Sequence, residues 1–181
     1  MPKLSSAAAK LVDASEARHE SGGTFEPLAP GRYLAKLAEV TTADPNKHGA
    51  VVWNAEFQEL LSLETETPAP GRQWLRLTLP SDPKKGVPAT YTNGPEKWDK
   101  YQAMLNGLLK GFFESFGYTV DSDTDELLGE YAIIELGIRT IQSGAREGEK
   151  TNEVKGIFPI PEDLDLEALG VNASGFDEEA F

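Results

Sequence analysis

The sequence predicts a mainly β chain with one prominent helix, in the order three strands, the helix and two further strands. Three observations support this class. Five segments read as strands, most of them alternating apolar and polar residues with the period of two that extended chains require. One later segment has apolar residues at steps of three and four, the spacing of an amphipathic helix. Clusters of Pro, Gly, Asn and Asp separate the segments, as turn residues do.

Length and composition suit one globular domain with tails. The chain has 181 residues, of which 39% are hydrophobic and 26% charged, so it can bury a core without cross-links. It contains no cysteine, which excludes a disulfide framework, a thiol nucleophile and a cysteine-based zinc site. No apolar run approaches the ~20 residues that a membrane span needs. We therefore expect a soluble, cytoplasmic protein.

The first half of the chain divides into a lead-in and two strands. Residues 1–24 are Ala-rich and are expected to form a short helix or a flexible segment, ending at a Ser-Gly-Gly break. Residues 25–31 contain two prolines and lead into the domain. Residues 32–42 and 51–61 read as the first two strands, and Trp53 and Phe57 are expected in the core because their face is apolar.

The third strand, residues 72–79, has two chemically different faces. Leu75, Leu77 and Leu79 share the face that we expect to be buried. The opposite face carries cations around a large aromatic, and two lysines follow it: the residues are Arg72, Trp74, Arg76, Lys84 and Lys85. Such a surface suits single-stranded nucleic acid, because a base stacked on an aromatic ring contributes roughly 1–3 kcal/mol while cations meet phosphates. The alternative is a solvated edge strand whose tryptophan a neighbouring loop covers.

The helix is expected to begin at residues 93–95, where Pro follows Asn-Gly, and to end at Gly117. The apolar stripe that should face the core consists of Trp98, Tyr101, Leu105, Leu108, Phe112 and Phe116. Trp98, at the expected exposed start of the helix, is a weaker candidate for nucleic-acid contact.

The acidic run at residues 121–125 does not match a calcium-binding loop. That loop requires Gly at its sixth position and a carboxylate at its twelfth, where this chain has Glu126 and Ala132. A solvated loop is the better interpretation, and we predict no metal or other cofactor. Residues 131–141 and 153–160 are the last two strands, joined by a Gly-rich tip. Three cations on these strands and their tip are weaker candidates for contact: Arg139, Arg146 and Lys150.

The net charge of −13 argues against nucleic acid, because an acidic protein repels phosphates. The acids are, however, segregated along the chain. Residues 162–181 carry −7 and residues 121–130 carry −5, which leaves −1 for the rest. Residues 71–110 carry +4. The segment around the third strand and the helix is therefore mildly basic.

The predicted order, β-β-β-α-β-β, is that of the OB-fold, a small, partly open five-stranded barrel that often binds oligonucleotides. The chain ends Gly-Phe-Asp-Glu-Glu-Ala-Phe after a small-residue linker. This end resembles the C-terminal tip of bacterial and phage single-stranded-DNA-binding proteins, with Ala-Phe where typical bacterial tails have Pro-Phe. Residues 30–35, the Trp53 strand and residues 152–154 are also similar to those of phage replication and recombination modules. The chain thus resembles phage-encoded single-stranded-DNA-binding proteins of the OB-fold type, over residues 25–161.

The resemblance implies three parts and a function. Residues 1–24 would be a flexible segment, 25–161 a domain that coats and protects single-stranded DNA in phage replication or recombination, and 162–181 an acidic linker and tip. The tip would recruit a polymerase, helicase or recombinase in the host cytoplasm. Its partner-binding residues would be Phe176, Asp177, Glu178, Glu179 and Phe181. Whether the chain forms a homo-oligomer is left open.

Two other classes were weighed against this hypothesis. Only His19 and His48 are available for histidine chemistry, and no phosphate-binding glycine loop occurs, so we predict a non-catalytic protein. A magnesium nuclease that uses carboxylates alone stays open. The other class is a β-barrel or sandwich module that binds proteins, or carbohydrate with Trp74 as the sugar platform. The neighbouring cations favour phosphate over sugar.

Overall fold

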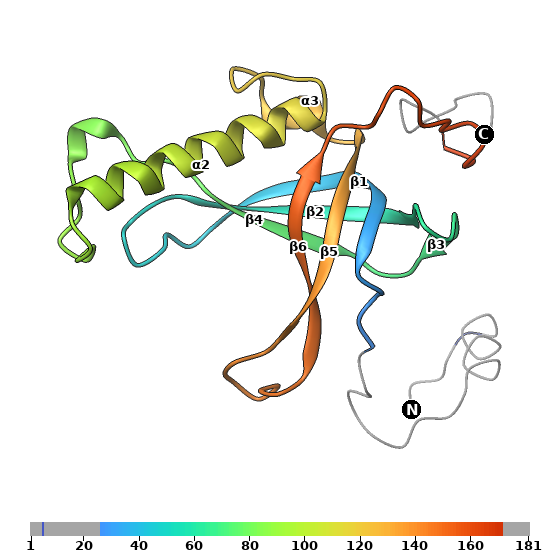
Figure 1. Ribbon diagram of the computed structural model, residues 1–181, viewed down its shortest axis with the longest axis horizontal. Helices are drawn as coiled ribbons and strands as arrows, with labels where there is room; N and C mark the ends of the chain where they lie inside the picture. The colour runs from blue at the N-terminus through green and yellow to red at the C-terminus, as the bar shows by residue number, and fades with distance from the viewer. Residues whose placement is uncertain (1–4, 6–25, 172–181) are drawn as a thin grey trace.

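A six-stranded antiparallel sheet and one long helix make up the computed structural model, which describes residue 5 and residues 26–171 (Figure 1). All five predicted strands and the helix are present, which confirms the mainly β class. They are β1 (Gly31–Ala43), β2 (Val52–Ser62), β4 (Gln73–Thr78), α2 (Pro95–Ser115), β5 (Tyr131–Thr140) and β6 (Lys150–Phe158).

Three short elements were not predicted: β3 (Pro68–Ala69), the 3₁₀ helix η1 (Pro83–Lys85) and α3 (Thr124–Leu127). The last of these corrects part of our interpretation of the acidic run as a solvated loop: its aspartates are exposed, but α3 begins within the run. The Asp123 carboxylate accepts a hydrogen bond of 3.0 Å from the Asp125 amide and so caps α3, while Leu127 at its end is fully buried.

The strands are connected as a meander followed by a return to the first strand. β1 pairs with β2 on one side and with β5 on the other. β3 and β4 both pair with the far edge of β2, and β6 pairs with β5. β4 and β6 contact each other, but no ladder joins them within the described residues. The sheet is therefore open along the seam between β4 and β6.

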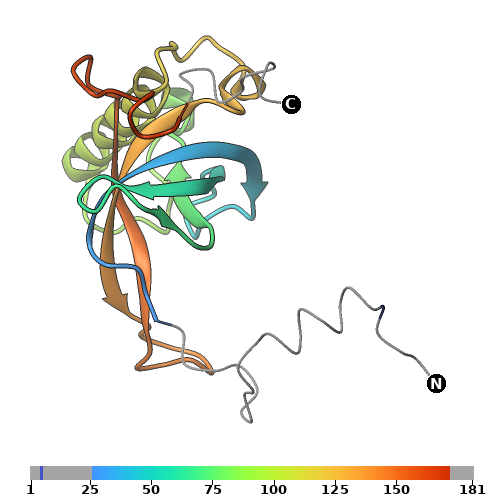
Figure 2. The same cartoon turned by 90° about the vertical axis from the view of Figure 1, so that its right-hand side faces the viewer.

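The β5–β6 hairpin extends beyond the rest of the sheet as an arm. β1 pairs with β5 only as far as Leu136, whereas the β5–β6 ladder continues to the pair Thr140 and Lys150. Figures 1 and 2 show that this arm, with its turn at residues 141–149, stands away from the sheet and from α2. We call residues 137–152 the arm. Its backbone is fixed by one neighbouring strand instead of two.

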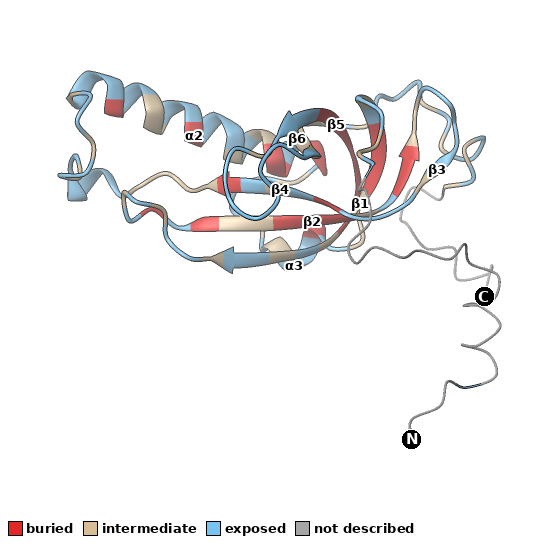
Figure 3. Ribbon diagram, turned by 90° about the horizontal axis from the view of Figure 1, so that it is seen from below, coloured by how far each residue is buried: buried red, intermediate tan, exposed pale blue. Residues whose placement is uncertain are grey.

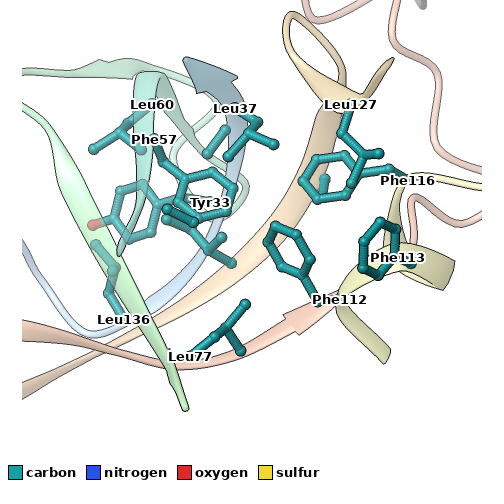
Figure 4. Close-up of a cluster of buried hydrophobic side chains, with 14 residues drawn as sticks. Tyr33, Leu37, Phe57, Leu60, Leu77, Phe112, Phe113, Phe116, Leu127 and Leu136 are labelled. Atoms are coloured by element: carbon teal, nitrogen blue, oxygen red, sulfur yellow. The ribbon is translucent and has the colours of Figure 1, made fainter. Parts of the chain in front are cut away.

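The main core lies between the sheet and the C-terminal half of α2 (Figure 4). Phe112 and Phe113 of α2 and its C-cap residue Phe116 are buried against inward-facing side chains of the sheet. Phe116 stacks on Phe57 of β2 with ring centroids 6.4 Å apart, and Trp53 meets Phe113 edge to face at 6.5 Å. The predicted core positions of Trp53 and Phe57 are therefore confirmed.

The helix stripe is wrong at one predicted position. Leu108 is 53% exposed, and its neighbour Leu109 packs against the core instead. Trp98 is only 5% exposed, which confirms its place in the stripe and contradicts the expectation that it lies exposed at the helix start. Figure 3 shows that much of the remaining surface of the helix, away from these buried positions, is exposed. Gly107 and Gly111 do not mark close packing, because a Cβ atom added to either would meet no atom within 4 Å.

The domain also continues further than the sequence suggested. Residues 159–171 return over a second cluster formed by Leu34, Leu61, Tyr131 and Ile133. The apolar side chains that pack against it from this segment are Ile160, Leu164, Leu166, Leu169 and Val171. Residues 162–171, expected to begin an acidic linker, therefore belong to the folded domain.

We predict that Phe112→Ala lowers the free energy of unfolding by about 3–5 kcal/mol, because it leaves a cavity between α2 and the sheet. Urea unfolding followed by tryptophan fluorescence measures this. Leu108→Ala, four residues earlier on the exposed side of the helix, is the control and should change stability by at most about 0.5 kcal/mol. Equal losses in the two variants would contradict the packing described here.

A second prediction concerns the glycines of α2. Gly107→Ala should raise the free energy of unfolding by about 0.5–1 kcal/mol, because the site is helical and open and Ala loses less backbone entropy. Gly117→Ala, the control, should be destabilising by about 1–2 kcal/mol, because Gly117 follows the helix with φ +81°. Thermal unfolding of both variants gives the signs. If Gly107→Ala were less stable than the wild type, this surface of α2 would be packed against another part of the protein, which would contradict the open site described here.

Candidate nucleic-acid interface

The outward face of β4 carries the most exposed large aromatic side chain in the described part of the chain. Trp74 is 57% exposed and Arg76, two residues later, is also exposed. Leu77 is buried against the core and Leu75 packs against it. The predicted division of this strand into two faces is therefore confirmed. Within the described residues, Trp74 is not covered by a loop, whereas the alternative interpretation required such a cover.

A carboxylate from the neighbouring strand holds the first arginine beside this ring. Glu56 lies directly opposite Trp74 in the β2–β4 ladder and is largely buried. Its Oε1 accepts a hydrogen bond of 2.8 Å from Nη1 of Arg72, whose side chain is exposed. The pair fixes the guanidinium next to Trp74, but it also neutralises part of the charge that Arg72 offers to a ligand.

A groove opens between the start of β4 and the arm, with a volume of about 590 Å³. We call it the Trp74 groove. Its lining combines segments from three parts of the sequence, including Glu26 and Leu28 of the lead-in, Arg72 and Trp74 of the third strand region, and Arg139 and Arg146 of the arm. Three of the four predicted arginine contacts thus meet around one tryptophan.

Asn152 of β6 links the lead-in to the arm through hydrogen bonds, and both segments line the groove. Its Oδ1 accepts a hydrogen bond of 2.8 Å from the Leu28 amide. Its Nδ2 donates to the carbonyl oxygens of Leu28 at 2.9 Å and Gly137 at 3.3 Å. These bonds satisfy the backbone of an otherwise irregular segment. They also bring Glu26, an acid, to the lining.

The two arginines of the arm that line the groove lie on different elements, one in the turn and one on β5. Arg146 lies in the turn, and its Nε donates to Oε2 of Glu149 at 2.6 Å. Both side chains are about half exposed, so an anionic ligand can compete for the guanidinium. Arg139 lies on β5 opposite Thr151, which also lines the groove.

The other predicted contact residues lie outside the groove. Lys84 and Lys85 are exposed on η1, beyond the end of β4, and Lys150 is exposed at the first residue of β6. Trp98 needs correction: it packs inside a ring cluster with Tyr91 at 4.8 Å and His48 at 5.9 Å, so its face is not offered to a ligand. Residues 176–181, the predicted partner-binding tip, lie outside the described residues.

Sequence reasoning missed Glu56, Asn152 and Glu26. Glu56 could have been found from the sequence: a carboxylate between Ala55 and Phe57, in a strand with a buried face, requires a partner for its charge. Asn152 and Glu26 could not have been found in this way. Their roles depend on the approach of segments more than one hundred residues apart in the chain.

Within residues 26–171, no group of three or more His, Asp and Glu side chains is arranged to hold a metal ion. The helices in the same range are all too short or too polar to cross a bilayer. A comparison with models of protein families and a comparison with curated proteins both find no match to this chain.

Proposed function

We propose that this chain is a non-catalytic single-stranded-DNA-binding protein that holds the strand on the outward face of β4 and in the Trp74 groove. The observation that carries the proposal is the exposed Trp74, with Arg72 and Arg76 on either side of it in the strand and two further arginines across the groove. An exposed aromatic ring among cations can stack a base and meet the adjacent phosphates.

The connectivity of the sheet supports the same proposal. A three-stranded meander, a helix and a hairpin that pairs back onto the first strand form the strand order of an OB-fold, here open between β4 and β6. In that fold the face of strands two and three commonly binds oligonucleotides. β2 and β4 are strands two and three of this chain when the two-residue β3 is set aside, and Trp74 lies on their outward face. We accordingly propose an OB-fold-like domain.

The expected binding has a clear energetic signature. Each base stacked on an aromatic ring contributes roughly 1–3 kcal/mol and depends little on salt. Each phosphate neutralised on a single strand adds about −0.7 to the slope of log affinity against log salt. Because Arg72 and Arg146 already have carboxylate partners, we expect stacking on Trp74 to supply the larger share.

The acidic tip extends the proposal to partners. We propose that residues 176–181 recruit a polymerase, helicase or recombinase of a phage replication or recombination system, on the strength of their Phe-Asp-Glu-Glu-Ala-Phe sequence. An aromatic side chain with acids before it suits a basic, apolar pocket on a partner.

We predict that Trp74→Ala weakens binding of a labelled dT oligonucleotide by about 5- to 150-fold, which corresponds to one lost stacked base. Because the ring is exposed, stability should change by at most about 0.5 kcal/mol. Fluorescence anisotropy and thermal unfolding measure the two effects. Trp74→Phe keeps an aromatic face and should retain most of the affinity.

Met104→Ala is the matched control, since Met104 is an equally exposed apolar side chain (52%) on α2, away from the groove. It should leave both affinity and stability unchanged. Absence of dT binding by the full chain, even at about 50 mM salt, would contradict the proposed function and favour a protein-interaction or carbohydrate-binding module. A large loss of stability in Trp74→Ala with unchanged binding would contradict the assignment of this face.

A further inference from the structure

A second hollow, of about 600 Å³, lies beyond the other end of the exposed face of β4. We call it the Tyr91 hollow. It is bounded by the β1–β2 turn with Lys47 and His48, by Arg76 of β4, by Tyr91 in the connection before α2, and by Tyr101 of α2. Figure 1 shows the β1–β2 turn and the first turns of α2 at the same end of the molecule. Of the residues that line it, only Arg76 is predicted from the sequence to contact nucleic acid.

The rings of the hollow support one another. Tyr91 lies nearly parallel to Tyr101, with centroids 6.4 Å apart and 12° between the planes, and it meets the buried Trp98 edge to face at 4.8 Å. His48 approaches Tyr91 edge-on at 5.5 Å, and its Nδ1 is 2.8 Å from the Thr90 hydroxyl. Because Trp98 is held by the fold, these half-buried rings are in place before any ligand arrives.

The turn that carries the cation is also held in place. Oδ1 of Asn46 accepts hydrogen bonds of 3.0 Å from the amides of His48 and Ala50. Lys47 therefore projects from a fixed turn and is exposed, as is Arg76 across the hollow. Among the described residues that line the hollow, none is acidic. Its lining thus combines aromatic faces with two cations, whereas the Trp74 groove includes the carboxylate of Glu26.

The two sites are connected along one strand. Trp74 lines the groove, and Arg76 lines the hollow. Both point outward from β4, and two residues of a strand span only about 7 Å. A nucleic acid that leaves Trp74 along β4 therefore meets Arg76 and then the tyrosines.

We propose that the Tyr91 hollow is a second nucleotide subsite, in which a base stacks on the Tyr91 and Tyr101 rings while Lys47 and Arg76 bind the adjacent phosphates. This inference rests on the proposed function and deepens it. A single DNA strand then follows β4 lengthwise, from the Trp74 groove to the hollow. Oligonucleotides long enough to fill both subsites bind more tightly than those that fill one.

The test uses the full chain and two labelled dT oligonucleotides, one of about 4 and one of about 16 nucleotides, the range of site sizes for such domains. Tyr101→Ala should weaken binding of the long oligonucleotide by about 5- to 150-fold and weaken binding of the short one by a smaller factor. Tyr101→Phe keeps the ring and should bind as the wild type does. Lys47→Gln should reduce the salt slope for the long oligonucleotide by about 0.7.

Lys47→Gln keeps the proposal testable should Tyr101→Ala fail to fold, because Lys47 is exposed in a turn. Lys110→Gln, an exposed lysine of α2 outside both sites, is the control for charge and should leave the salt slope unchanged. Wild-type affinity of Tyr101→Ala for the long oligonucleotide, together with an unchanged salt slope in Lys47→Gln, would overturn the second subsite. If Trp74→Ala still weakens binding in that case, the proposed function stands. If the wild type binds neither oligonucleotide, both proposals fall.

Discussion

The packing of three phenylalanines from α2 against the sheet is the constraint on which the rest of the fold depends. Phe112, Phe113 and Phe116 cover the inward faces of β2 and β4, where they meet Phe57 and Trp53. Burying one such ring is worth about 1.5–3 kcal/mol, so the three together are comparable with the whole stability of a small domain. No other described helix is long enough to supply this cover.

That packing also determines what β4 presents to solvent. Because successive side chains of a strand point to opposite faces, the burial of Leu77 forces Trp74 and Arg76 outward. A slip of one residue in the β2–β4 ladder would put the tryptophan into the core and a leucine into water. The ladder itself is fixed by the pair Ala55 and Leu75 on the core side and by Glu56 opposite Trp74 on the other. The core and the exposed aromatic are thus two consequences of one register.

The sequence was sufficient where the information is local. The alternation of the third strand, the helix start and its end at Gly117 depend on neighbours in the chain, and each prediction is confirmed. Leu108 and Leu109 were confused because steps of three and four residues both keep a helical stripe, and only the position of the sheet decides between them. The acids of residues 162–171 dominate the composition of this segment and predict a linker. The apolar residues of the same segment, however, meet a second cluster on β1, β2 and β5.

The candidate site was predictable in its residues but not in its shape. Arg72, Trp74 and Arg76 are adjacent in one strand, so the sequence alone places them on one face. The meeting of that face with Arg139 and Arg146 depends on the arm, and the arm depends on how far β5 and β6 pair beyond β1. The Tyr91 hollow is formed by the β1–β2 turn, β4 and α2 together. The periodicity of the sequence does not predict that these segments lie side by side.

The distribution of charge implies different roles for the two proposed subsites. In the Trp74 groove, Arg72 and Arg146 already have carboxylate partners. A phosphate that binds there replaces an existing ion pair, so the free energy gained is only the difference between the two pairs. In the Tyr91 hollow, the lining brings Lys47 and Arg76 together without an acid. In this proposal, an acidic chain that repels phosphates overall would hold a strand mainly by stacking at Trp74, where two of the three arginines have carboxylate partners. It would draw its salt-dependent affinity from the hollow, whose described lining contains no acid.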